Sequence, residues 1–268
     1  MKIGFIGAGN MGGAILRGYA EAAAEKGHKI LVYNRTEETR KALEAEFTCV
    51  SACVAADELT QKSDVVLLGV KPNMFGELLP QIAPVCTDDK LVISMAAGIS
   101  LAYIEEFLGS SQPVIRIMPN TPAQVGEAMT SVSRNGNVTD EMMDVAMDIF
   151  GAIGRAEEVD EELIHCVIGV SGSSPAYTYM YIDALAQAAE ANGMEAEKAK
   201  VFAAQAVLGA AKMVLENMDT TPEQLRINVC SPGGTTIEAV NTLFENGFME
   251  DVKDGFQAAV DKSRKMTK

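Results

Sequence analysis

Short apolar runs alternate with helical patterns along the first 160 residues. The chain opens on an apolar run around Ile3, Phe5 and Ile6, typical of a strand buried in a parallel sheet, and a helical pattern follows from Met11 through Lys26. Further strands are expected near 29–34, 48–50, 64–70, 90–95, 113–117, 128–133 and 155–159. Helices are expected at 37–47, 56–62, from 73, at 100–108 and at 139–152. This order predicts a doubly wound α/β sheet.

From residue 160 the alternation stops and helical patterns dominate. They cover 164–171, 176–191 and 195–217, and a further helix is expected with Ser231 as its cap and Pro232 at its first position. Alanines spread around several faces of 195–217, which suits a helix buried against other helices. About a hundred residues of helix can hardly bury this apolar surface alone. We therefore expect a homo-oligomer, with a monomeric helical cap on the first domain as the alternative.

The chain therefore divides into an α/β Rossmann-like domain at 1–159 and an all-α domain at 160–268. Its 268 residues are 48% hydrophobic, and the formal net charge of −15 argues against nucleic acid or an anionic membrane as a partner. No apolar run reaches bilayer length and no signal peptide precedes Lys2, which favours the cytoplasm.

Cysteine and histidine change the picture little. The five cysteines lack a C-x-x-C pair, so we expect reduced thiols, most of them in the core. His28 and His165 lack metal-ligand spacing to each other or to a cysteine, so no metal site is expected and neither receives a catalytic role.

The first strand leads into a glycine-rich turn. Gly7, Gly9 and Gly12 have the G-x-G-x-x-G spacing. The first glycine suits a tight turn, the second a close approach by a pyrophosphate, and the third close packing of helix on strand. With a strand before and a helix after, this spacing predicts dinucleotide binding at the helix N-terminus.

The end of the second strand bears on which dinucleotide binds. It reads Asn34-Arg35-Thr36, with no carboxylate to accept from a ribose, so a 2′-phosphate would meet a guanidinium and a hydroxyl. This favours NADPH over NADH, although Asn34 also tolerates a bare ribose. Thr36 is expected to cap the helix at 37–47 as well.

Other strand ends fall on the carboxyl edge of the sheet, where ligands bind in open α/β folds. Lys71 lies at one of them, where contact with cofactor or solvent is favoured over a role as a catalytic amine. The loop Met118-Pro-Asn-Thr-Pro122 is stiffened by two prolines, and it is either a wall of the nicotinamide or substrate site or a plain connector.

The second chemical signal lies at 228–236. Gly233 and Gly234 expose backbone N–H groups near a helix start, which is a natural seat for a carboxylate, and Thr235 and Thr236 add hydroxyls. Taken alone, the stretch is equally a well-capped helix.

Six stretches together resemble the pyrroline-5-carboxylate reductase family and run in the family's order. They are Phe5–Gly12, Val70–Pro72, Ala96–Gly98, Met118–Pro122, Val170–Tyr177 and Ser231–Thr236. The resemblance implies NAD(P)H-dependent reduction of 1-pyrroline-5-carboxylate to L-proline, the last step of proline biosynthesis. It also implies intertwined helical domains that form a homodimer, often a decamer, with active sites at the dimer interface.

The resemblance also implies site residues. The substrate carboxylate would lie on the N–H groups of Thr235 and Thr236, beside Asn228 and Gly234, and the Thr236 hydroxyl would bond the imine nitrogen as the catalytic group. The cofactor residues would be Ile6, Gly7, Ala8, Gly9, Asn10, Met11, Asn34, Arg35, Thr36, Gly69, Val70, Lys71, Pro72, Ala96, Ala97 and Gly98. Two departures are Ala56, where many members carry Asn, and Ser174, where many carry Gly.

Two other functions are alternatives. A β-hydroxyacid dehydrogenase would need a catalytic lysine in the helical domain, and Lys198, Lys200 and Lys212 lack the supporting glycine and asparagine context. A redox-sensing regulator would bind a dinucleotide without turnover. Imine reduction needs no histidine, because a protonated imine already has its proton and the enzyme mainly orients it.

Overall fold

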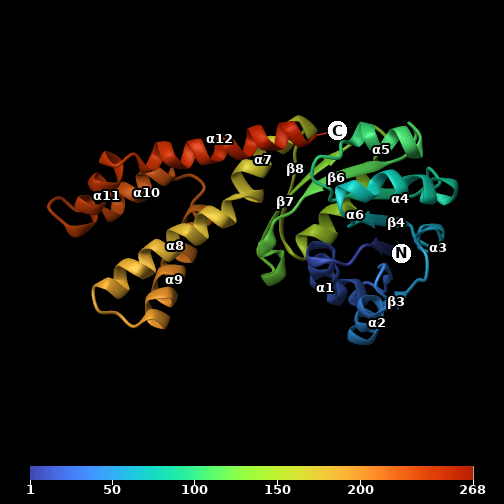
Figure 1. The fold of residues 1–268 in the computed structure, drawn as a ribbon, viewed down its shortest axis with the longest axis horizontal. Helices are drawn as coiled ribbons and strands as arrows, with labels where there is room; N and C mark the ends of the chain where they lie inside the picture. The colour runs from blue at the N-terminus through green and yellow to red at the C-terminus, as the bar shows by residue number, and fades with distance from the viewer. Residues whose placement is uncertain (268) are drawn as a thin grey trace. The chain divides into compact units, whose positions relative to one another are not determined.

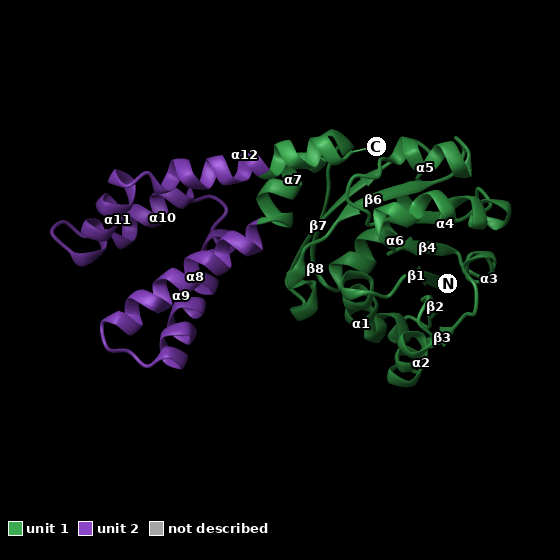
Figure 2. Cartoon of the chain, in the orientation of Figure 1, with its two compact units in different colours: residues 1–173, 259–268 green, residues 174–258 purple. Residues whose placement is uncertain are grey.

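The computed structural model describes residues 1–267 and divides the chain into two compact units. Unit 1 consists of residues 1–173 together with 259–268, and unit 2 of residues 174–258 (Figure 2). The segment 160–173 therefore groups with the α/β region rather than with the helices that follow it. The helix α12 (Phe248–Met266) begins in unit 2 and ends in unit 1.

Unit 1 is built on a single sheet. Over the described residues it has eight strands in the order β3-β2-β1-β4-β5-β6-β7-β8, and all neighbours are parallel except β6 and β7. The strands are β1 Lys2–Ile6, β2 Lys29–Tyr33, β3 Val50–Ala52, β4 Val65–Leu68, β5 Leu91–Ser94, β6 Val114–Met118, β7 Ala128–Arg134 and β8 Gly154–Glu158. The order reverses at β1 and β4, as in doubly wound dinucleotide-binding sheets. The third strand lies at 50–52, later than the expected 48–50.

Helices cover both faces of this sheet (Figure 1). They are α1 Asn10–Glu25, α2 Glu37–Glu46, α3 Ala56–Lys62, α4 Phe75–Ile82, α5 Leu101–Leu108, α6 Asp140–Gly151 and the short α7 Ile164–Val167. One core cluster joins Ile15 of α1 and Phe150 of α6 to the strands. The other joins Leu59 of α3, Phe75 of α4 and Ile104 of α5. Burial on both faces explains why the strands are apolar throughout.

Unit 2 is helical and has little core of its own. Besides the first part of α12, it contains α8 Ser174–Ala191, α9 Ala196–Glu216, α10 Pro222–Val229 and α11 Thr235–Glu245. In the described part of the chain its core cluster holds three buried residues, Ala186, Ala199 and Ala203. The helices α10 and α12 are not among those expected from the sequence. No helix within residues 1–267 is long and apolar enough to cross a membrane.

Three local expectations are wrong. Ser231 does not cap a helix, since α11 begins at Thr235 with Gly234 at the N-cap position. The turn at 231–234 closes first, with the Gly234 N–H donating to the Ser231 carbonyl at 3.0 Å. Thr36 occupies the N-cap position of α2, but its side chain makes no capping bond. Of the cysteines, only Cys53 and Cys86 are buried, and Cys166 is exposed.

Candidate cofactor and substrate sites

The glycine-rich turn between β1 and α1 is held by close backbone contacts. Gly7 has a φ of +96°, and a Cβ there would lie 2.7 Å from the Gly69 backbone. A Cβ at Gly12 would lie 2.2 Å from the Gly7 carbonyl oxygen, so both positions exclude a side chain. At Gly9 a Cβ would meet no described atom within 4 Å. Gly9 therefore keeps backbone open to a ligand rather than satisfying packing.

The N-terminus of α1 fits a bound phosphate. Gly9 is its N-cap residue, and no side chain caps the helix among the described residues. Unpaired N–H groups at such an end carry partial positive charge and bind anions. An open Gly9 and an uncapped 16-residue helix are the two features that a dinucleotide pyrophosphate requires here.

The end of β2 is tied to this turn. The Ala8 N–H donates to Asn34 Oδ1 at 3.3 Å, and Arg40 Nη1 donates to the Asn34 carbonyl at 3.1 Å. Asn34 is thus held at both its side chain and its backbone. Arg35 and Thr36, which follow it, are exposed. Arg40 was not among the candidates predicted from the sequence, although its place one turn into α2 puts a second cation near the end of β2.

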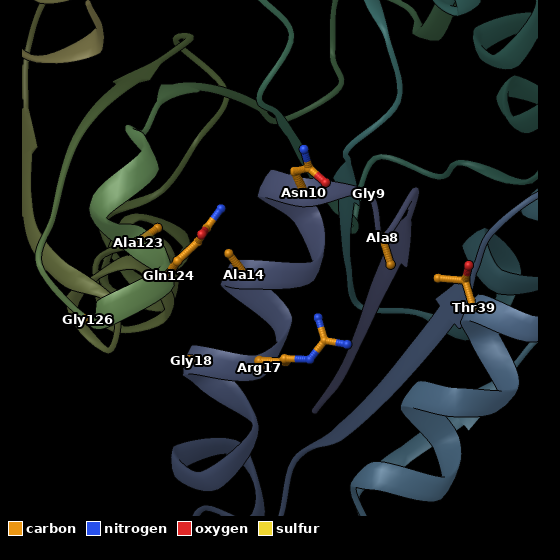
Figure 3. Close-up of a pocket in the computed structure, with 10 residues that line it drawn as sticks. All are labelled: Ala8, Gly9, Asn10, Ala14, Arg17, Gly18, Thr39, Ala123, Gln124 and Gly126. Atoms are coloured by element: carbon orange, nitrogen blue, oxygen red, sulfur yellow. The ribbon is translucent and has the colours of Figure 1, made fainter. Parts of the chain in front are cut away.

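A cavity of about 750 Å³ borders the first turns of α1 (Figure 3). In Figure 3, Gln124 projects from its helical turn toward α1, while Arg17 extends from α1 toward the side on which Thr39 lies. The residues that line the cavity are Ala8, Gly9, Asn10, Ala14, Arg17, Gly18, Thr39, Ala123, Gln124 and Gly126. Three of these were candidates from the sequence, whereas Arg17, Thr39 and Gln124 were missed because each comes from a different segment.

The remaining cofactor candidates lie where the next strands end. The Gly69 N–H donates to the Ile6 carbonyl at 2.8 Å, so the end of β4 adjoins the glycine-rich turn. The Met95 N–H donates to the Leu68 carbonyl at 3.3 Å, which brings the start of the 96–98 loop beside it. Lys71 is exposed. The candidates at 6–11, 34–36, 69–72 and 96–98 therefore follow β1, β2, β4 and β5 at one edge of the sheet.

Asn120 is engaged in structural hydrogen bonds. Its Nδ2 donates to the Ser171 carbonyl at 3.1 Å, and its Oδ1 accepts from the Met129 N–H at 2.9 Å. Ser171 belongs to a π-helical turn, Ile168–Gly172, which directly precedes α8. The amide of Asn120 thus connects β7 to this turn, which supports the connector interpretation of the 118–122 loop.

The substrate candidates lie in unit 2, at the start of α11. Gly233 has a φ of +70°, and a Cβ at Gly234 would lie 2.5 Å from Ser231 Oγ. No side chain caps α11 in the part of the chain that the structure describes, so the first N–H groups of this 11-residue helix are free of a cap. Thr235 is exposed and Thr236 is half-buried. Asn228 lies in the preceding helix and accepts from Gln224 Nε2 at 2.9 Å.

The histidines lie outside both sets of residues. His28 Nδ1 is 3.1 Å from the Tyr19 hydroxyl, and burial, together with the N-terminal amine and Lys26, lowers the pKa of His28. His165 Nδ1 is 2.8 Å from Ser263 Oγ, and burial, with help from Arg116, lowers its pKa. Within residues 1–267 no group of three or more His, Cys, Asp and Glu side chains could hold a metal ion.

The two departures from the family pattern, Ala56 and Ser174, each lie at the start of a helix and accept a hydrogen bond from a threonine of the same helix. Ala56 is fully buried at the start of α3, where its carbonyl accepts from Thr60 Oγ1 at 2.8 Å. Ser174 begins α8, and its carbonyl accepts from Thr178 Oγ1 at 3.0 Å.

Comparisons with known proteins agree along the whole chain. The model "Pyrroline-5-carboxylate reductase dimerisation" matches residues 161–266, and "NADP oxidoreductase coenzyme F420-dependent" matches residues 2–98. A pyrroline-5-carboxylate reductase of Escherichia coli is 45% identical over 267 residues, covering 100% of this chain and 98% of that protein. The one from Pisum sativum is 36% identical and covers 99% and 96%.

Solved structures give the same result. A pyrroline-5-carboxylate reductase from Coxiella burnetii has a TM-score of 0.92 at 33% identity, covering 99% of this chain and 98% of that one. A Plasmodium falciparum pyrroline carboxylate reductase with NADP bound has a TM-score of 0.87 at 31% identity, covering 100% and 98%. Since likeness at this level extends over both units and includes a dimerisation region that supports a homo-oligomer, the chain belongs to the pyrroline-5-carboxylate reductase family.

Proposed function

We propose that the two parts of this reductase divide its reaction: residues 1–159 bind NADPH, and residues 160–268 bind the substrate and assemble the enzyme. The reaction is the NAD(P)H-dependent reduction of 1-pyrroline-5-carboxylate to L-proline, the last step of proline biosynthesis. The match of the dimerisation model from residue 161 onward supports this functional boundary.

The cofactor site is proposed along the carboxyl edge of the sheet. The uncapped start of α1 would hold the pyrophosphate, with Ile6, Ala8, Asn10 and Met11 around the open backbone of Gly9. The other proposed contacts are Gly7, Asn34, Arg35, Thr36, Gly69, Val70, Lys71, Pro72, Ala96, Ala97 and Gly98. The absence of a carboxylate at 34–36 supports a preference for NADPH over NADH.

The substrate site is proposed at the start of α11. The N–H groups of Thr235 and Thr236 would hold the carboxylate at the positive end of the helix, with Asn228 and Gly234 beside them. The half-buried Thr236 hydroxyl would accept from the protonated imine nitrogen and so fix the ring orientation.

This division explains the chemistry without a histidine. Bound NADPH would supply a hydride to the carbon of the C=N bond, and the electron pair of that bond would then neutralise the charge on nitrogen. Because the protonated imine already has its proton, the chain's residues need only hold the carboxylate, orient the N–H and exclude misaligned binding. The observation that carries the proposal is the uncapped start of α11, with Thr236 in its first turn.

Spectrophotometry of NADPH oxidation tests the function directly. We expect oxidation when 1-pyrroline-5-carboxylate is added and none with the keto forms of 3-hydroxyacids. Oxidation with the keto acids would favour a β-hydroxyacid dehydrogenase. Tight NADPH binding without turnover on any imine would favour a redox-sensing regulator.

The assembly and location complete the proposal. The active form is proposed to be a homodimer, with the active site formed at the dimer interface as the family resemblance implies, and a decamer as the larger assembly to test. The match to a dimerisation model supports the dimer. The proposed location is the cytoplasm.

A further inference from the structure

A buried arginine on β6 lacks hydrogen-bond partners, within the described residues, for two of its three guanidinium nitrogens. Arg116 of β6 is 2% exposed, and its Nη1 donates to Glu161 Oε1 at 2.8 Å. No partner within residues 1–267 reaches its Nε or its Nη2. Burying a charge with unsatisfied donors costs more than one ion pair returns, and such pairs are weak evidence for a stabilising role.

Hydroxyl groups on the two neighbouring strands tie this part of the sheet to two loops. Arg116 is in register with Ser94 of β5 on one side and with Ser133 of β7 on the other. Ser94 Oγ accepts from the Ala96 N–H at 3.3 Å, which fixes the start of the 96–98 loop. Ser133 Oγ donates to the Val159 carbonyl at 2.8 Å, which fixes the segment that leads to Glu161.

Glu161 connects these loops. The oxygen that accepts from Arg116 also accepts from the Leu101 N–H at 2.9 Å, the first N–H of α5. Because α5 begins at Leu101, three residues after Gly98, Glu161 holds the chain just beyond the far end of the 96–98 loop. The loop is thus fixed at its start by Ser94 and at its end by Glu161, whose position depends on Arg116.

A further contact restricts the loop from another side. Gly98 has a φ of +78°, and a Cβ there would lie 2.6 Å from the Met266 carbonyl oxygen at the end of α12. Close packing against that carbonyl leaves the loop little freedom to adjust if its end is released.

We propose that Arg116 and Glu161 are positioning residues for hydride transfer: the pair sets the conformation of the 96–98 loop and, through it, the nicotinamide end of the cofactor. This inference rests on the proposed cofactor site, which includes that loop. The adenosine end is proposed near Asn34, which accepts from the Ala8 N–H on other elements, so the pair should not affect it.

The test separates the two ends of the cofactor. Glu161→Ala removes the acceptor of the Leu101 N–H, and we expect kcat to fall roughly 10–100-fold, the cost of a small misplacement of reacting groups. The dissociation constant of 2′,5′-ADP, which has only the adenosine half, should not change. Glu161→Gln keeps an oxygen for both donors and should recover most of kcat.

A control and a second variant protect the test. Arg134→Met removes the two ion pairs that Arg134 of β7 makes with Asp140 and Glu158, and it should leave kcat unchanged. If Glu161→Ala does not fold because Arg116 stays buried and unpaired, Arg116→Met combined with Glu161→Gln leaves no unpaired charge at this position. That double variant should fold and still lose kcat relative to Glu161→Gln alone.

The outcomes separate this inference from the proposed cofactor site. Gly98→Ala perturbs the loop directly, and an unchanged kcat there would overturn the placement of the loop beside the nicotinamide. If Gly98→Ala lowers kcat but folded Glu161→Ala and the double variant do not, the positioning role alone is wrong. Equal weakening of 2′,5′-ADP and NADPH by Glu161→Ala would also overturn it.

Discussion

The two units differ in how far they bury their apolar residues. In unit 1, residues such as Ile15, Phe75 and Phe150 are fully buried against the sheet by the same chain. In unit 2, Phe202 is 67% exposed and Met180 is 73% exposed. Its helices also border an apolar cavity of about 380 Å³, lined by Tyr181, Leu185, Ala206, Val207, Ala210, Ala211 and Val214. Unit 1 therefore buries its apolar residues within one chain, whereas unit 2 has surfaces suited to a second copy of the chain.

The units also present their candidate ligand groups differently. Unit 1 uses close backbone contacts, such as those of Gly7 and Gly12, to shape a binding edge from several strands. The candidate groups of unit 2 are one uncapped helix start, at Thr235, and the hydroxyl of Thr236. From this difference we propose that unit 1 provides rigid positioning and that a short segment of unit 2 orients the imine. Four experiments test this division.

The largest effect is expected at Thr236. Thr236→Ala keeps the backbone donors of α11 and removes the hydroxyl that is proposed to orient the imine, so kcat should fall roughly 10–10³-fold. NADPH binding, which is proposed for unit 1, should be unchanged. Steady-state kinetics and cofactor titration measure both. Thr236→Ser is the control and should recover much of the activity, and a wild-type kcat in Thr236→Ala would remove the catalytic role from unit 2.

Arg35 tests whether unit 1 selects the cofactor. Arg35→Ala should raise KM for NADPH much more than KM for NADH, because a charge-assisted phosphate contact contributes about 1.5–3 kcal/mol. Lys41→Ala removes an exposed cation of α2 that is paired with Glu37, and it should leave the ratio of the two KM values unchanged. Equal effects of Arg35→Ala on both cofactors would contradict the phosphate contact.

Phe202 tests the exposed surface of unit 2. Light scattering should show a mass well above that of one chain, and Phe202→Asp should raise the dissociation constant of the assembly roughly tenfold or more, because a buried Phe contributes about 1.5–3 kcal/mol. Val54 is the matched control, since it is 74% exposed in unit 1 and Val54→Asp should not change the mass. An active wild-type monomer at micromolar concentration would break the comparison.

The smallest effect is expected on the pH dependence of stability. Both histidines lie in unit 1, and burial lowers the pKa of His28. The folded protein therefore binds fewer protons than the unfolded chain as the pH falls below about 6.5, so stability decreases with falling pH. His28→Gln should make the denaturation midpoint slightly less sensitive to pH between neutral and mildly acidic solution. An unchanged slope would show that His28 contributes nothing to it.

Much of unit 1 could be predicted because its signals are local. The helix expected at 56–62 agrees with α3, and the strand expected at 128–133 falls within β7, since apolar periodicity and burial coincide there. The helix start in unit 2 could not be placed in the same way. Ser231 and Pro232 are residue types that often begin a helix. However, Gly233 has a positive φ and forms a turn before the helix begins.

The candidate site shows a similar limit. The sequence points to Gly7, Gly9 and Asn34 because motif and spacing lie within one strand–helix–strand unit. Arg116 and Glu161 are 45 residues apart, and only the tertiary fold brings them together. No periodicity marks such a pair, so its role depends on tertiary structure.

The course of α12 has a consequence for how the chain is made. Val260 and Ser263 are buried in unit 1, yet they belong to a helix whose end is synthesised after all of unit 2. As domains fold from the N-terminus during translation, the strands of unit 1 can pair well before these residues emerge. The loop beside Met266 then receives its last packing contact only after all of unit 2 has left the ribosome. A nascent chain would therefore hold a formed sheet, with the 96–98 loop still lacking this contact, until the end of α12 has been synthesised.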